Sequence, residues 1–124
     1  MDELVLKITP MMVLPDINPV AQQYGMLGAD LLDSGDPGCI GVQAGKSHMI
    51  LVTADLLRGY LSAKTVTPLV GTTVPYIFVR SLADAKARLL RGALVVEEAL
   101  TPEGTREAVV VQHGQFMVLA EKVE

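Results

Sequence analysis

Residues 8–17 read Ile-Thr-Pro-Met-Met-Val-Leu-Pro-Asp-Ile, an apolar, strand-forming run that leads into the start of a helix. We expect a strand over residues 4–14, in which Pro10 favours an edge position or a point where no ladder hydrogen bond is made. Asp16 is the expected N-cap, because apolar residues recur after it at helical spacing until Gly28, a plausible stop. The stretch therefore predicts a strand followed directly by an amphipathic helix.

Three short strands are expected after this helix, near residues 30–34, 38–44 and 48–53. Turn-forming sequences, Asp-Pro-Gly and Gly-Lys-Ser, separate the last two strands from their neighbours. Residues 54–73 lack clear periodicity beyond a helical turn or two, and we interpret them as a linker. The first module therefore covers about residues 4–53.

The same order of elements begins again in the second half, where residues 75–85 read Pro-Tyr-Ile-Phe-Val-Arg-Ser-Leu-Ala-Asp-Ala. A strand over residues 74–79 leads to Ser81, which forms a capping box with Asp84. The helix is expected to end at Gly92, and strands follow near residues 94–99, 106–112 and 115–121. The sequence predicts an α+β fold, one domain over residues 1–124 with two βαβββ modules, the second at about 74–122.

The composition excludes several classes of protein. The net charge of −4 and the pI near 5.1 argue against a nucleic-acid binder, which needs a cationic surface. Half of the residues are hydrophobic, yet no uncharged apolar run approaches the roughly 20 residues that cross a bilayer. The acidic start at Met1–Leu4 does not have the layout of a secretion signal. The single cysteine, Cys39, is typical of a reducing compartment, so we expect a cytoplasmic protein.

A third motif lies near the end of the chain, where residues 101–108 read Thr-Pro-Glu-Gly-Thr-Arg-Glu-Ala and residues 114–121 read Gly-Gln-Phe-Met-Val-Leu-Ala-Glu. Together with the stretches at 8–17 and 75–85, it resembles the vicinal oxygen chelate superfamily, which holds glyoxalase I, bleomycin-resistance proteins, fosfomycin-resistance enzymes and extradiol dioxygenases. The resemblance covers nearly the whole chain outside the linker. It implies mixed, curved sheets that form a cleft, often in a homodimer.

In metal-dependent members of that superfamily, one ligand comes from the first and one from the last strand of each module. The resemblance places these four positions at Thr9, Leu51, Val74 and Val118. Three are aliphatic and the fourth is threonine, whereas divalent metals prefer imidazole or carboxylate donors. We therefore expect neither a metal nor another cofactor. A metal-dependent enzyme remains possible if strand register misplaces the ligands.

Alternation along the strands then predicts which side chains face the cleft. The cleft is expected to be largely apolar, which fits a pocket for a mostly apolar small molecule as well as a closed core. Arg106 is included because it could pair with an anionic ligand group, although an ion pair across the hairpin is its more ordinary role. The predicted ligand-binding residues are Thr9, Met11, Val13, Met49, Leu51, Val74, Tyr76, Phe78, Arg106, Phe116 and Val118.

For the histidines, the cysteine and the Gly-Lys-Ser stretch, the sequence context favours ordinary structural roles. His48 and His113 lie at turn edges, and we interpret both as surface histidines. Acidic neighbours would raise the pKa of the Cys39 thiol, which makes an inert thiol the favoured interpretation. Residues 41–47 contain Gly-Lys-Ser but lack the spacing of a phosphate-binding loop, and a strand follows them where that loop needs a helix.

Two functions remain open. The first, which we favour, is a metal-free small-molecule-binding protein similar to bleomycin-resistance proteins, which sequester a drug without altering it. The second is a glyoxalase-like enzyme, an isomerase or lyase without a metal, acting on a hydrophobic metabolite. Its catalytic residues are not assigned; the candidates are His48, Tyr76, Arg106 and Glu107. Either protein is expected to form a homodimer and to bind neither nucleic acid nor membranes.

Overall fold

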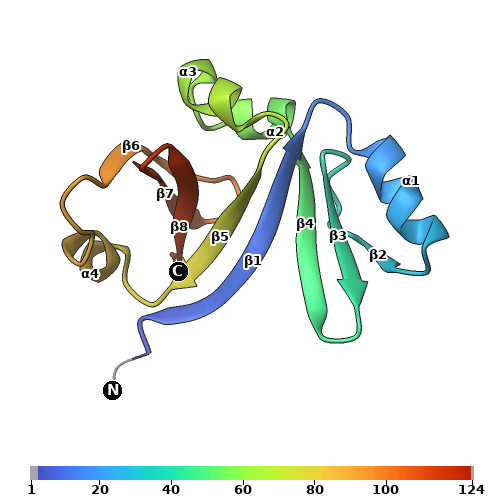
Figure 1. Cartoon of the computed structure of the whole chain (residues 1–124), viewed down its shortest axis with the longest axis horizontal. Coiled ribbons are helices and arrows are strands. Elements are labelled where there is room, and N and C mark those ends of the chain that lie inside the picture. The colour runs from blue at the N-terminus through green and yellow to red at the C-terminus, as the bar shows by residue number, and fades with distance from the viewer. Residues whose placement is uncertain (1–2, 124) are drawn as a thin grey trace.

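The structure is a computed structural model that describes residues 3–123, so Met1, Asp2 and Glu124 of the expected domain lie outside the described residues. All eight strands belong to one sheet in the order β2-β3-β4-β1-β5-β8-β7-β6 (Figure 1). The first module consists of β1 (Val5–Leu14), α1 (Asn18–Met26), β2 (Asp30–Asp33), β3 (Cys39–Ala44) and β4 (Ser47–Thr53). The second consists of β5 (Thr73–Val79), α4 (Leu82–Ala87), β6 (Leu94–Leu100), β7 (Thr105–Gln112) and β8 (Gln115–Lys122). The predicted α+β fold with two βαβββ modules is confirmed.

The two modules join where β1 and β5 run antiparallel at the centre of the sheet. Pro10 lies directly opposite Pro75, so the expected edge position for Pro10 is wrong. The alternative expectation, a point where no ladder hydrogen bond is made, fits the parallel ladders. The pairing of β1 with β4 begins at Met11, and that of β5 with β8 begins at Tyr76. Each proline therefore lies just before a parallel ladder, where its missing N–H costs no inter-strand bond of that ladder.

Two helices cover what we call the outer face of the sheet, one for each module. Ile17 and Ala21 bring α1 onto the buried side chain of Leu51. Leu82 and Ala85 bring α4 onto the opposite half. Figure 1 shows the two helices on opposite sides of the molecule, with the central strands β1 and β5 between them.

The helix ends differ in part from the predictions. Ser81 caps α4 as expected, because its hydroxyl accepts a hydrogen bond from the Asp84 backbone N–H at 3.1 Å. The N-cap of α1 is Ile17 and not Asp16. Asp16 lies one residue before this cap, and its carboxylate accepts a hydrogen bond from the Asn18 N–H at 3.0 Å. The prediction that Gly92 ends the second helix is also wrong: α4 stops at Ala87, and Gly92 makes the turn towards β6 with a φ of 97°.

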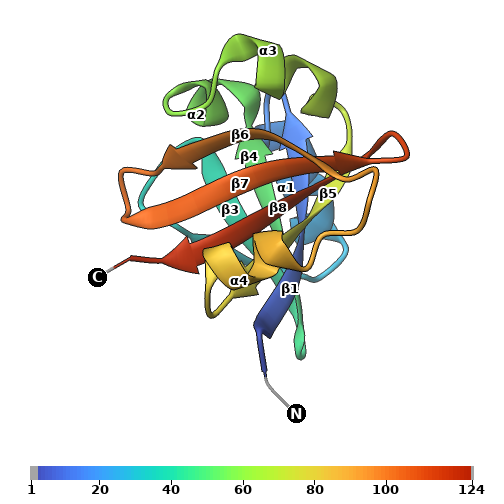
Figure 2. The same ribbon diagram turned by 90° about the vertical axis from the view of Figure 1, so that its left-hand side faces the viewer.

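The segment interpreted as a linker is part of the core. It forms α2 (Ala54–Arg58), α3 (Ala63–Val66) and a short 3-10 helix, η1 (Thr67–Leu69). Figure 2 shows α2 and α3 together at one end of the sheet. Their apolar side chains pack on the inner face, which we define as the face that carries Met11, Tyr76 and Val118. Within residues 3–123, no helix is long and apolar enough to cross a membrane.

Candidate functional site

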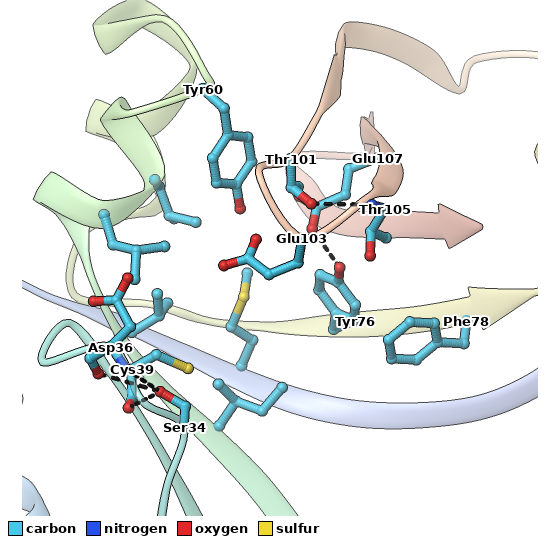
Figure 3. Close-up of a pocket in the computed structure, with 15 residues that line it drawn as sticks. Ser34, Asp36, Cys39, Tyr60, Tyr76, Phe78, Thr101, Glu103, Thr105 and Glu107 are labelled. Carbon is cyan, nitrogen blue, oxygen red and sulfur yellow. Dashed lines mark hydrogen bonds between the residues drawn. The ribbon is translucent and has the colours of Figure 1, made fainter. Parts of the chain in front are cut away.

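A cavity of about 270 Å³ opens on the inner face between the two modules (Figure 3). Strands β1, β4 and β5 form its floor, α2 and Tyr60 cover one side, and β7 with the two turns before β3 and β7 completes the wall. Most of the floor is apolar. The lining residues are Met11, Ser34, Asp36, Cys39, Ile50, Val52, Leu56, Leu57, Tyr60, Tyr76, Phe78, Thr101, Glu103, Thr105 and Glu107.

Glu107 is the most deeply buried acidic group of this cavity, with only 4 % of its surface exposed. Alternation along β7 turns it inward, while its neighbour Arg106 is exposed. The Tyr76 hydroxyl donates a hydrogen bond to Glu107 Oε2. Figure 3 shows Tyr60 reaching towards the same region from the turn that follows α2. A carboxyl group is therefore held between tyrosine hydroxyls at the end of an apolar cavity.

Burial governs the protonation of this cluster. Desolvation raises the pKa of Glu107; hydrogen bonding by Tyr76 and Tyr60 opposes that rise, and the charge of Glu103 adds to it. The pKa values of Tyr60 and Tyr76 are also raised, first by burial and then by the neighbouring Glu107 carboxylate. Both tyrosines therefore stay neutral donors. Glu107 is the acidic group of this cluster, and burial favours its neutral form.

Two aromatic rings form one apolar end of the floor. Tyr76 and Phe78 lie two residues apart on β5 and so share the inner face. Their ring centroids are 5.1 Å apart at an interplanar angle of 66°, an edge-to-face contact. The arrangement leaves an aromatic surface beside the Glu107 carboxyl group.

The opposite wall is the turn between β2 and β3. Ser34 donates its hydroxyl to the Cys39 carbonyl at 2.7 Å, and Asp36 Oδ1 accepts from the Gly38 N–H at 2.8 Å. A side chain at Gly38 would place its Cβ 2.8 Å from Thr53 Oγ1, so only glycine lets the turn approach α2 this closely. Burial raises the pKa of the Cys39 thiol, followed by a lowering effect of Ser34. An inert thiol is the consistent interpretation.

The structure divides the predicted ligand-binding residues between cavity and core. Met11, Tyr76 and Phe78 line the cavity. Four others pack in the inner-face core, and Thr9 is buried opposite Tyr76 in the ladder. Open pocket and closed core are thus both present on the same face. The four core residues are Val13, Val74, Phe116 and Val118.

Three of the predicted orientations are wrong. Met49 and Leu51 face outward and pack in the cluster beneath α1, whereas Ile50 and Val52 line the cavity. The continuous apolar run of β4 has no alternation, so its phase could not be read from the sequence. Arg106 is exposed and lies opposite Glu121, and its neighbour Glu107 takes the inward position.

The sequence analysis missed Tyr60 and Glu103. Tyr60 follows α2 in the segment interpreted as a linker, and only the spacing of Leu57 and Leu61 hinted that this segment is buried. Glu103 lies in the turn before β7, where a Pro-Glu-Gly sequence indicates a turn without saying which way its side chain points. No local signal places either residue in a cavity.

The residues present do not fit the metal of the metal-dependent members. With β4 in its observed phase, the four corresponding positions are Thr9, Ile50 or Val52, Val74 and Val118, and none has an imidazole or carboxylate. Across residues 3–123, no three or more His, Cys, Asp or Glu side chains are grouped closely enough to hold a metal ion. No step through a metal is therefore derived for this site.

The remaining candidates lie away from Glu107 or are exposed. His48 packs near Gly41, and its Nδ1 atom is buried without a hydrogen-bond partner among the described residues. His113 is exposed in the β7–β8 turn with a φ of 52°. Gly45 and Lys46 form the tight turn between β3 and β4, so the residues 41–47 build a hairpin and not a phosphate-binding loop.

Several solved structures share this arrangement. A glyoxalase/bleomycin resistance protein/dioxygenase superfamily member from Vibrio splendidus 12B01 is 13 % identical with a TM-score of 0.57, and the match covers 94 % of this chain and 98 % of that one. An uncharacterised protein from Bacillus halodurans C-125 is 18 % identical with a TM-score of 0.57 and covers 95 % of each chain. One from Methanosarcina mazei is 20 % identical with a TM-score of 0.52, covering 98 % of this chain and 94 % of its own.

These likenesses show the fold. The chain has the glyoxalase/bleomycin resistance/dioxygenase fold, which is that of the vicinal oxygen chelate superfamily. No family model matches the sequence, and no curated protein matches it by sequence comparison. Because one fold carries many activities, the function has to be argued from the cavity.

Proposed function

We propose that this protein, built on the glyoxalase/bleomycin resistance/dioxygenase fold, binds a small, mostly apolar molecule in the cavity and needs no metal to do so. One observation carries the proposal: the cavity of about 270 Å³ has an apolar floor and a single buried polar cluster at Glu107. Such a combination is typical of ligand pockets, in which apolar area supplies affinity and a few polar groups fix orientation. Burial contributes about 25 cal/mol per Å² of apolar area before the costs of association.

Filling the cavity tests this proposal. Ile50 lies at the cavity floor and is partly buried, so Ile50→Trp should occupy the binding space. Leu94→Trp, on the exposed side of β6, is the matched control. We expect small aromatic compounds to raise the melting temperatures of the wild-type protein and of L94W but not that of I50W. The stabilisation of the wild-type protein should persist after treatment with EDTA. Equal stabilisation of I50W, or loss of binding with EDTA, would contradict the proposal.

A second function is favoured by Glu107 itself. A buried carboxyl group with a raised pKa, next to neutral tyrosine hydroxyls, has the properties of a general base or acid. It would support an isomerase or lyase reaction on a hydrophobic metabolite without a metal. The test is recovery of the bound compound: an altered product formed by the wild-type protein and not by Glu107→Gln identifies an enzyme, whereas unchanged recovery identifies a binding protein.

We also propose a homodimer in the cytoplasm. The dimer is supported by the exposed apolar side chains of Leu6 and Ile8 on β1, a strand at the centre of the sheet. The location is supported by the single cysteine, and the net charge of −4 argues against nucleic acid as a partner.

A further inference from the structure

We infer that the ligand of this cavity is a cation, an amine or amidine whose apolar body rests on the cavity floor. The inference rests on the proposed function and specifies its ligand class. It departs from the sequence-based alternative in which an inward Arg106 could pair with an anionic ligand group. Arg106 is exposed, and the ionisable group that points inward is the carboxyl group of Glu107.

The first argument is the charge of the lining. Three carboxyl groups line the cavity, those of Asp36, Glu103 and Glu107, and no lysine, arginine or histidine is among the lining residues. An adjoining cavity of about 380 Å³ shares Asp36 and Glu103 and adds Asp55, which is already paired with Arg58 at 3.2 Å. An anionic ligand would be repelled along the whole path from the mouth to Glu107.

The second argument is the graded depth of these charges. Asp36 and Glu103 are exposed and flank the mouth, while Glu107 lies at the buried end. Figure 3 shows the Glu103 side chain among the lining residues, between Asp36 on one side and Glu107 on the other. The exposed pair attracts a cation from solution, and the buried carboxylate holds it where solvent screening is weak.

The third argument is the chemistry around Glu107. An ionised carboxylate has about four acceptor sites, more than the hydroxyls of Tyr60 and Tyr76 can use, so it can accept N–H donors from a ligand. Three of the five aromatic residues of the chain, Tyr60, Tyr76 and Phe78, surround this position. Aromatic faces attract cations as well as apolar groups. A protonated amine with an apolar body meets both demands.

The fourth argument is proton linkage. Burial makes ionised Glu107 costly in the empty cavity, and a bound ammonium group would offset that cost, so binding should release a proton. Tyr60, Tyr76 and Cys39 face the same space, and their raised pKa values keep them neutral. The affinity for an amine should therefore rise with pH through the titration of Glu107, until the amine itself loses its proton.

Three compounds with one apolar body test the inference: phenethylamine, phenethyl alcohol and phenylacetate, titrated by calorimetry into the wild-type protein. We expect the amine to bind about tenfold or more tightly than the alcohol, and phenylacetate more weakly than both. Glu107→Gln should remove that preference while leaving the alcohol within about threefold, and Glu103→Gln should reduce it in part. Glu98→Gln, which changes the same residue type beside Lys86 and outside the cavity, should preserve it.

The outcomes separate the two proposals. If the alcohol binds and the amine binds no better, or if E107Q keeps the preference for the amine, the inferred cationic ligand is contradicted. The proposed binding of small molecules in the cavity would then still hold. If none of the three compounds binds, the binding cavity itself is contradicted. An amine affinity that falls as the pH rises from about 5 to 8 would also overturn the inference.

Discussion

Glu107 is subject to two opposing effects. Burial favours its neutral form, whereas the Tyr76 and Tyr60 hydroxyls favour the ionised form, and burial is the larger effect. The folded state therefore holds the proton more tightly than the unfolded chain does. The contribution of Glu107 to stability should be greatest below its ordinary pKa of 4.5 and should fall as the pH rises through its raised pKa in the folded state.

Glu107→Gln should remove this pH dependence. Glutamine keeps an acceptor oxygen for the tyrosines and cannot ionise, so above the raised pKa of Glu107 the variant should be more stable than the wild type by about 1 to 3 kcal/mol. Near pH 4 the difference should be within about 1 kcal/mol. Urea unfolding as a function of pH measures it. A variant that is destabilised most at high pH would show that ionised Glu107 stabilises the fold.

Tyr76→Phe isolates the contribution of the hydrogen bond. The hydroxyl donates to a carboxylate, and such bonds contribute about 1.5 to 3 kcal/mol. We expect a loss of that size at pH values above the raised pKa of Glu107, where the carboxyl group is ionised, and a smaller loss in acid. In the Glu107→Gln background the effect of the same substitution should shrink, as a double-mutant cycle would measure. Equal losses in both backgrounds would mean that the two residues are not coupled.

At the scale of residues, prediction failed where alternation is absent. Met49 to Val52 is one continuous apolar run. The position assigned from the resemblance, Leu51, faces outward, whereas its neighbours Ile50 and Val52 line the cavity. Arg106 and Glu107 are adjacent charges, and nothing local says which one is buried. Strand β5 was readable, because Tyr76 and Phe78 could be placed in phase with Val74.

At the scale of elements, a helix cap could be predicted, whereas the packing of the segment interpreted as a linker could not. The Ser81 cap depends on local sequence and was correct. Residues 54–73 pack only because the two modules form a curved surface beneath them, and that surface is created by long-range pairing. Glu97 on β6 fixes this segment further: its carboxylate accepts from the Ser62 N–H at 3.1 Å and from the Ser62 hydroxyl at 2.9 Å.

Leu69→Ala tests whether this segment belongs to the core. Leu69 is fully buried, so its truncation should destabilise the protein by about 2 to 5 kcal/mol through lost burial and a residual cavity. Leu90→Ala is the matched control, because Leu90 is 74 % exposed and should cost less than about 0.5 kcal/mol. Thermal or urea unfolding measures both. Similar values for the two variants would mean that the segment packs too loosely to be core.

At the scale of the whole molecule, the fold could be predicted from the order of the strands and helices and not from residue identity between the two halves. A strand, a capped helix and three strands occur twice, and this repeat was visible from Pro10 with Pro75 and from Asp16 with Ser81. The same repeat predicted that two βαβββ modules form one domain. It could not predict the cavity, because an unfilled volume depends on the lengths of side chains that meet from five separate segments.

The proposed homodimer makes the last prediction. Ile8 is 62 % exposed on β1, at the centre of the sheet and opposite Ile77 on β5. Figure 1 shows α1 and α4 on either side of these central strands. Exposed apolar groups at such a place are typical of an interface. Ile8→Lys should therefore convert a dimer into a monomer near 13.2 kDa, as light scattering after size-exclusion chromatography would show. Leu90→Lys, at a more exposed apolar position beyond α4, should leave the dimer intact. A monomeric wild-type protein would contradict the dimer, and a dimeric I8K variant would place its interface elsewhere.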